Sequence, residues 1–303
     1  MDARGRLPLG VSVGDGGTAD FKALRRLAAL AEDLGYQSFW VGETRRWDPF
    51  VLTSALARDT REIRFGIGVA NMYARSAPAL AMAAASAWEV SGGRLIVGVG
   101  IGTATRAIRW HERNHDRPHR RLAETVAFLR SAWRGDVARP QDVLRVDGFS
   151  CGLRPSGYIP LFVAAEGIQG LRAAARFSDG WLSAFLALDE FEAAVRWIRD
   201  SRASTSQPEP FQIVPIVHTN VTEDVSGALE EVGKVLGSRD ARVRRPGTQR
   251  AISERCAVGS AEDVSGRIRA LFRLGATSVV AGALGHEEHW QIERTWKCLS
   301  RAS

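Results

Sequence analysis

The chain has 303 residues, 45% of them hydrophobic, and a formal net charge of +7, so it can bury a sizeable core. No apolar run approaches the ~18 residues that a membrane-spanning helix needs, and the basic residues are scattered rather than gathered with aromatic residues as nucleic-acid binding requires. The N-terminus leads directly into a strand-like segment. The three cysteines are far apart and odd in number, which argues against a disulfide framework and predicts a cytoplasmic protein.

Short apolar segments alternate with segments of helical period through the first half of the chain. Gly35 follows the first helical segment, and a glycine at this position readily takes the left-handed conformation that ends a helix. The predicted strands are residues 9–13, 38–41, 65–69 and 95–99, and the predicted helices are residues 21–34, 49–59, 78–90 and 120–133.

The second half repeats this alternation. Its predicted strands are residues 161–164, 181–184, 211–217 and 278–281, with helices to residues 177 and 200, over 225–236, and from 287 onward. Eight strand–helix units predict an α/β fold that closes as one (β/α)8 TIM barrel over residues 1–303. A doubly wound two-domain arrangement would need a central linker. Residues 201–210 are the candidate, and a connection within a barrel explains them equally well.

Two segments interrupt the alternation. Apolar and polar residues alternate around Asp147-Gly148, which predicts an inserted β-hairpin near residues 140–158. Residues 238–255 are polar, rich in arginine and poorly periodic, which predicts a loop.

Four sequence motifs occur in an order that resembles the luciferase-like family of oxidoreductases. They are spread over about residues 7–285, and the resemblance rests on their order rather than on any one of them. The motifs are Gly68-Val69-Ala70-Asn71-Met72-Tyr73-Ala74-Arg75, Ser91-Gly92-Gly93-Arg94 with the turn Gly98-Val99-Gly100-Ile101-Gly102, Ala164-Ala165-Glu166-Gly167 with Ser178-Asp179-Gly180-Trp181, and Val258-Gly259-Ser260-Ala261-Glu262-Asp263-Val264.

This resemblance implies a TIM barrel that binds a flavin-like cofactor, a small-molecule substrate and a homodimeric assembly. The residues at the end of the third strand are most similar to those of the branch that uses coenzyme F420, a deazaflavin. FMN is the alternative cofactor. Family members hold a non-proline cis peptide bond at the end of this strand. The residues implied in cofactor binding are Gly68, Val69, Ala70, Asn71, Val99, Gly100, Ile101, Gly102, Thr103, Ala165, Glu166, Gly167 and Ile168.

The position of these residues agrees with barrel geometry, because active sites of barrels lie at the carboxyl ends of the strands. Glycines there let the backbone approach a phosphate or a ring, and a helix that begins after the turn favours an anion. A tight turn that binds no ligand is the alternative reading. Arg75 is a candidate contact for an anionic cofactor tail.

The chemistry needs a proton donor near the hydride acceptor, and Glu43, Asp15 and Thr44 are the candidate catalytic residues. Family members often carry a histidine where this chain has Thr44, so a histidine proton donor is missing. Glu43 as an ion-paired residue of the rim is an equally good reading. Trp47 and Tyr73 are candidates to cover the ring or the substrate, or else to pack the fold.

His111-Glu112-Arg113-Asn114-His115 matches the zinc-protease pattern, in which two histidines one helical turn apart bind the metal. Pro118 and the charged surroundings argue against such a helix, so we expect a polar loop and no metal site.

Taken together, the sequence predicts an F420-dependent oxidoreductase that reduces a C=C, C=N or C=O bond of a small molecule by hydride transfer. The alternatives are an FMN-dependent luciferase-like monooxygenase and a barrel that binds a cofactor without turnover. We expect no nucleic-acid partner and no membrane association.

Overall fold

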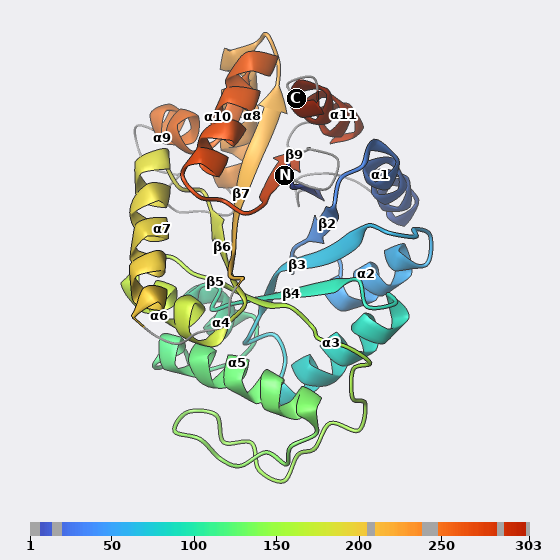
Figure 1. The fold of residues 1–303 in the computed structure, drawn as a ribbon, viewed down its shortest axis with the longest axis vertical. Coiled ribbons are helices and arrows are strands. Elements are labelled where there is room, and N and C mark those ends of the chain that lie inside the picture. Colours follow the sequence, from blue (N-terminus) through green and yellow to red (C-terminus); the bar gives the residue numbers. More distant parts are fainter. Residues whose placement is uncertain (1–6, 14–19, 205–209, 238–247, 284–287, 301–303) are drawn as a thin grey trace. The chain divides into compact units, whose positions relative to one another are not determined.

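A computed structural model of the chain describes residues 7–13, 20–204, 210–237, 248–283 and 288–300. These residues fall into two compact units, one built from residues 41–182 and 198–211, the other from residues 1–40, 183–197 and 212–303 (Figure 1). No helix in the described ranges is both long enough and apolar enough to cross a membrane.

The unit around residues 41–182 contains a parallel sheet of strands β3 (Arg64–Asn71), β4 (Leu95–Gly100) and β5 (Leu161–Ala164), with β6 (Gly180–Ala184) pairing alongside β5. The helices of this unit are α2 (Pro49–Ala57), which precedes β3, and α3 (Ala77–Val90), α4 (Ala104–Arg109), α5 (Pro118–Arg134) and α6 (Gly167–Phe177), which lie between the strands in sequence. Strand β4 is buried along its whole length, as a parallel strand covered on both faces should be.

Local sequence signals account for the starts of two of these helices. Asp48 caps α2 by accepting hydrogen bonds from the backbone N–H groups of Phe50 and Val51, and Ser76 caps α3 through Ala79 N–H. Both helices carry a proline in their first turn, where its missing N–H has no cost. The alanine-rich face of α3 is buried.

Two of the sequence motifs hold this unit together. Arg94, which precedes β4, donates hydrogen bonds to Ala57 O at 2.6 Å and to Ile63 O at 3.0 Å, and so fixes the end of α2 and the start of β3. Asp179, which precedes β6, accepts a hydrogen bond from the backbone of Leu161 at 2.7 Å and pairs with Arg130 of α5. Both residues therefore position strands.

The other unit contains further parallel strands. Strand β1 (Leu9–Val13) pairs with β2 (Ser38–Val41) and β9 (Val279–Ala283), and the long strand β7 (Gln212–Val221) pairs with β9 and with β8 (Ala257–Gly259). The helices labelled here are α1 (Phe21–Leu34), α8 (Val225–Gly237), α9 (Thr248–Arg255), α10 (Ala261–Arg273) and α11 (Glu288–Ser300) (Figure 1). Helix α7 (Leu188–Ala203) is divided between the two units.

All eight predicted strands are present. Four further elements lie outside the predicted alternation of strands and helices, namely the short elements β8, α4 and α9 and the longer helix α10. The prediction of a loop at 238–255 is wrong for residues 248–255, which form α9 because Ile252 is buried there against Phe185, Val232 and Cys256. Residues 238–247 lie outside the described part of the chain.

The predicted hairpin near residues 140–158 is an irregular segment without strands. Ala138 donates to Phe149 O at 2.7 Å and accepts from Gly148 N–H at 3.0 Å, which is the beginning of a hairpin ladder. The ladder does not continue, because the N–H groups of Val143 and Leu144 both donate to the buried carboxylate of Glu124 at 2.8 Å. An inserted segment is therefore present as expected. It is attached to α5 through Glu124 and does not form a hairpin of its own.

Candidate functional site

The carboxyl ends of β3, β4 and β5 lie next to one another and bring the predicted cofactor residues together. Asn71 of β3 is level with Gly100 of β4, and Gly100 is level with Ala164 of β5. A further hydrogen bond runs from Met72 N–H to Gly100 O at 3.1 Å. These contacts show that three turns far apart in the sequence share one edge of the sheet.

The end of β3 is irregular. The Gly68–Val69 peptide bond is cis, as the family resemblance implied, and the pairing register with β4 shifts between Ile67 and Ala70. A Cβ at Gly98 would lie 2.5 Å from Ile67 O, and a Cβ at Gly100 would lie 2.8 Å from Val69 Cγ2. The absence of side chains at these two glycines therefore serves the packing of β4 against the irregular end of β3.

Gly102 and Asn71 form the turn that follows β4. Gly102 has a φ of 58°, in the left-handed region, and a Cβ there would lie 2.8 Å from Asn71 Nδ2. Asn71 is buried, and its side-chain oxygen accepts a hydrogen bond from Tyr73 N–H at 2.9 Å. Thr103 caps α4 by accepting from Arg106 N–H at 3.2 Å. Ile101, Gly102 and Thr103 are partly or fully exposed, so this turn is open to a ligand.

The turn after β5 is open as well. Helix α6 begins at Gly167 with Glu166 as its N-cap residue, and no side chain caps its first N–H groups. Gly167 has a φ of 73°, and a Cβ there would meet no atom within 4 Å. Glu166, Gly167 and Ile168 are exposed. Ala165 lies just before them and accepts a hydrogen bond from Trp181 Nε1 at 2.9 Å. An uncapped helix start beside exposed backbone suits an anionic group.

Glu43 lies beside the end of β3. Its Oε2 accepts a hydrogen bond from Asn71 N–H at 2.6 Å, and its Oε1 pairs with Arg75 Nη1 at 2.5 Å. The backbone N–H of Glu43 also donates to Val69 O at 3.3 Å. Glu43 therefore binds the irregular end of β3 through both its side chain and its backbone. It is ion-paired, which is the alternative to a catalytic role that the sequence analysis gave for this residue.

Arg75 joins two carboxylates, since its other nitrogen pairs with Asp48, the N-cap residue of α2. Its guanidinium also lies 5.0 Å from the centroid of the Phe50 ring. Burial alone would lower the pKa of Arg75, but Glu43 and Asp48 outweigh it and raise that pKa above its ordinary value. Arg75 is committed to this network, and neither the network nor the role of Asp48 was predicted from the sequence.

The remaining predicted residues lie around this centre in different environments. Thr44 is half-buried, and its hydroxyl accepts a hydrogen bond from Arg46 N–H at 3.2 Å. Trp47 is exposed. Tyr73 is 1% exposed, with its ring centroid 5.2 Å from that of His115. Asp15 lies outside the described residues.

The His111–His115 segment does not form the helix that a zinc-protease site needs. Residues 111–115 are not helical, and Glu112 has a φ of 51°. Pro118 begins helix α5 instead of ending a helix. Within the described residues no group of three His, Cys, Asp or Glu side chains is arranged to hold a metal ion.

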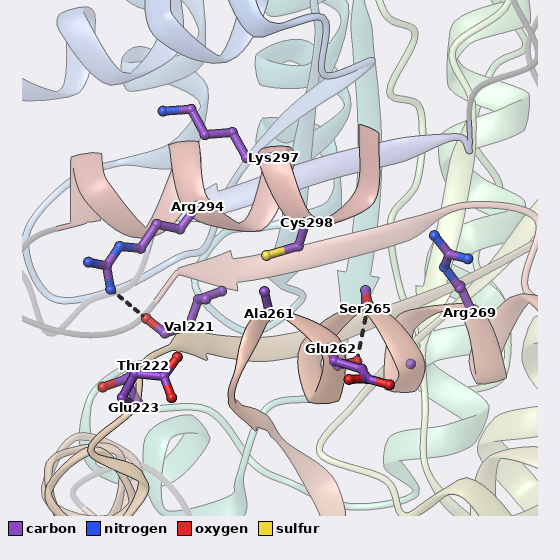
Figure 2. Close-up of a pocket in the computed structure, with 11 residues that line it drawn as sticks. Val221, Thr222, Glu223, Ala261, Glu262, Ser265, Arg269, Arg294, Lys297 and Cys298 are labelled. Carbon is purple, nitrogen blue, oxygen red and sulfur yellow. Dashed lines mark hydrogen bonds between the residues drawn. The ribbon is translucent and has the colours of Figure 1, made fainter. Parts of the chain in front are cut away.

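A separate pocket of about 710 Å³ lies in the other unit, between α10, α11 and the end of β7. Figure 2 shows Cys298 on α11 above Ala261, and Arg294 hydrogen-bonded to the carbonyl oxygen of Val221 at 3.0 Å. Among the residues that the structure describes, none predicted for cofactor binding or catalysis lines this pocket.

Relatives of known activity resemble the chain over most of its length. It is 25% identical over 294 residues to the 5,10-methylenetetrahydromethanopterin reductase of Methanolobus tindarius, covering 84% of this chain and 88% of the reductase.

Solved structures resemble its fold. A structure of an F420-dependent secondary alcohol dehydrogenase in complex with an F420–acetone adduct matches with a TM-score of 0.86 at 16% identity, over 98% of this chain and 99% of the other. EDTA monooxygenase from Chelativorans sp. BNC1 matches with a TM-score of 0.79 at 17% identity, over 98% and 94% of the two chains. These matches, together with the parallel strands and alternating helices, identify the fold as the predicted (β/α)8 barrel.

The family model described as luciferase-like monooxygenase matches residues 6–278. That range contains every described residue assigned above to the cofactor or to catalysis. The chain therefore belongs to the luciferase-like monooxygenase family.

Proposed function

We propose that this chain is an F420-dependent oxidoreductase, which reduces a C=C, C=N or C=O bond of a small molecule. The relative from Methanolobus tindarius is a reductase, and the dehydrogenase of similar fold was solved with an F420 adduct. The observation that carries the proposal is the row formed by Asn71, Gly100 and Ala164, with open turns on both sides of it.

The residues at this edge fit a flavin-like cofactor with an anionic tail. The uncapped start of α6 at Gly167 and the exposed turn at Gly102 and Thr103 would hold the tail, because backbone N–H groups at a helix start attract anions. The irregular strand end at Gly68–Val69 would support the ring. When bound, reduced F420 supplies the hydride.

Within this proposal Glu43 positions the strand end rather than donating a proton. Both oxygens of its carboxylate are engaged, one with the guanidinium of Arg75 and the other with the backbone N–H of Asn71. The alternative, in which Glu43 donates the proton, remains a prediction from the sequence, as do the catalytic assignments of Thr44 and Asp15. Thr44 carries a hydroxyl near the end of β2, and Trp47 offers an exposed indole in the same loop.

The FMN-dependent monooxygenase remains the alternative function. It is supported by the match to EDTA monooxygenase and by the family model. A barrel that binds a cofactor without turnover is a second alternative. We further propose that the chain acts as one domain, as a homodimer in the cytoplasm, and without nucleic-acid partners.

Equilibrium binding of oxidised F420 and of FMN, followed by quenching of tryptophan fluorescence, tests the proposal. We expect F420 to bind at least tenfold more tightly than FMN, and reduced F420 to be consumed with a substrate from a panel of imines, enones and ketones. Tighter binding of FMN would favour the monooxygenase. Binding of neither cofactor would contradict the proposal.

A further inference from the structure

The pocket between α10 and α11 exists because one face of α10 carries small side chains. The α10 residues that line it run from Ala261 to Arg269 and recur with the period of a helix, so they share one face. Ser265 and Gly266 form the middle of this face. A Cβ at Gly266 would meet no atom within 4 Å, so the space beside this residue is open.

The walls of the pocket are held in place by hydrogen bonds within the chain. Gln291 of α11 accepts a hydrogen bond from Val221 N–H at 2.7 Å, and Arg294 donates to Val221 O at 3.0 Å. Helix α10 begins with a capping box, in which the side chains of Ser260 and Asp263 each accept the other residue's backbone N–H, at 3.2 and 3.0 Å. A pocket with fixed walls binds a ligand without the cost of ordering them.

Charges of opposite sign lie in different parts of the pocket. The carboxylates of Glu223 and Glu262 make no hydrogen bond or ion pair with any residue that the structure describes. Figure 2 shows Glu223 toward the β7 end of the pocket and Arg269 toward the other end. Glu262 is in the first turn of α10, and Arg269 lies two turns later, ~10 Å along the helix axis.

The rest of the lining balances these charges. Arg294 binds the carbonyl oxygen of Val221 at the β7 end, so the two carboxylates and this guanidinium leave one net negative charge there. Lys297 is paired with Glu293 at 3.2 Å. Arg269 therefore gives the other end one positive charge. A simple anion would be repelled by the carboxylates, and a simple cation by Arg269.

We propose that this pocket binds a linear zwitterion, a short peptide whose ammonium group meets Glu223 and Glu262 and whose carboxylate meets Arg269. Three residues match the separation of these charges, since an extended chain spans about 3.3–3.6 Å per residue. An ammonium group donates hydrogen bonds to carboxylates, and a guanidinium binds a carboxylate through two parallel hydrogen bonds. The uncharged middle of the ligand would lie against Ala261 and Cys298, which face one another across the pocket (Figure 2).

The pocket is large enough for such a ligand, at about 710 Å³. It shares no described residue with the candidate cofactor site, so the proposal goes beyond the proposed function and does not depend on it. Its test accordingly needs neither F420 nor turnover.

Trialanine is the probe, and isothermal titration calorimetry of the full chain measures its binding. We expect one molecule of trialanine to bind per chain. N-acetyl-trialanine lacks the ammonium group and trialanine amide lacks the carboxylate, so each should bind about tenfold more weakly, as expected when a hydrogen bond between charged groups is lost. No binding of trialanine, or equal affinity for all three peptides, would overturn the proposal.

Substitutions on α10 test the position of the site. Gly266→Leu should abolish trialanine binding, because its side chain would extend into the open space of the pocket. Its melting temperature should equal or exceed that of the wild type, since leucine favours a helix more than glycine does. Arg269→Gln should weaken trialanine binding about tenfold and leave the affinity for trialanine amide unchanged. Glu192→Gln, at an exposed glutamate of α7, is the control.

The thiol of Cys298 provides a second readout, because it lines the pocket. Trialanine should slow the alkylation of Cys298 by iodoacetamide, and N-acetyl-trialanine at the same concentration should not. Trialanine affinity that is the same in the wild type, Gly266→Leu and Arg269→Gln would overturn the proposal. An alkylation rate that trialanine leaves unchanged would also overturn it.

Discussion

Glu43 and Arg75 are joined by an ion pair with 2.5 Å between Oε1 and Nη1, and the side chains of both residues are largely buried, at 13% and 16% exposure. The second oxygen of Glu43 accepts the backbone N–H of Asn71, so the pair connects helix α2, through Asp48, to the end of β3. The end of β3 at the candidate site is therefore held in place by a network of charged side chains that bind one another.

Replacing Arg75 with glutamine should lower the free energy of unfolding by ~2 kcal/mol, because two carboxylates lose their cation. Urea denaturation measures this loss, with Arg113→Gln as the control at an exposed arginine. In a Glu43→Gln variant the Arg75→Gln substitution should lower the free energy of unfolding by less, because one of the two carboxylates that bind Arg75 is already replaced by a neutral amide. Fully additive losses would show that the two residues act separately.

Gly167→Ala should weaken F420 binding about tenfold if the cofactor tail approaches the start of α6 as proposed. Gly148→Ala is a matched control, because both glycines have a φ near 70°, at 73° and 68°, and a Cβ at either would meet no protein atom within 4 Å. Both variants therefore carry a similar backbone strain. Equal effects of the two substitutions on F420 affinity would place the tail elsewhere.

Acid should release the inserted segment near residues 140–158 from helix α5. Burial would raise the pKa of Glu124, but hydrogen bonds from Leu144, Val143 and Arg120 outweigh it and lower that pKa below its ordinary value of 4.5. A lowered pKa contributes stability that is present above pH 4.5 and is lost as the pH falls through the folded-state pKa.

Glu124→Gln should therefore be less stable at neutral pH and should flatten the loss of stability below pH 4.5. Thermal unfolding over a pH series measures this, with Glu192→Gln, an exposed glutamate, as the control. A variant with the wild-type pH profile would exclude Glu124 as the titrating group.

Cys256 should resist thiol reagents in the native protein. It is 2% exposed, and burial raises its pKa to about 12 against the opposing effect of Arg267 and Arg255, so little thiolate forms at neutral pH. Labelling with iodoacetamide followed by mass spectrometry should modify the less buried Cys298 first. Rapid modification of Cys256 would mean that α9 opens readily.

Chelation should leave the protein unchanged. The His111–His115 segment is not helical, so its two histidines are not spaced as zinc ligands. Dialysis against EDTA is expected to alter neither the melting temperature nor the turnover of reduced F420. A fall in either quantity that zinc restores would identify a metal requirement.

The sequence predicted the strands because a buried parallel strand is a short apolar run, as in β4, and this signal depends only on nearby residues. It missed β8, whose three residues pair with the end of β7 only through the tertiary structure. It predicted a hairpin where Glu124 takes the N–H groups of Val143 and Leu144, because a competing hydrogen bond from a distant helix leaves no local signal.

The candidate site was predicted only in the part that depends on where the strands end. That Asn71 and Gly100 lie side by side follows from the rule that parallel strands end at one edge. The bond between Glu43 and Arg75 spans 32 positions of sequence and depends on the paths of two loops. The packing roles of Gly98 and Gly100 depend on the irregular end of β3, which the residues alone do not reveal.

Every residue assigned to the cofactor lies between Gly68 and Ile168, inside one compact unit of the chain. Substitutions that set the cofactor preference can therefore be confined to this unit, while the rest of the barrel changes independently. A chimera that receives only this stretch from an FMN-dependent relative should take the cofactor preference of its donor.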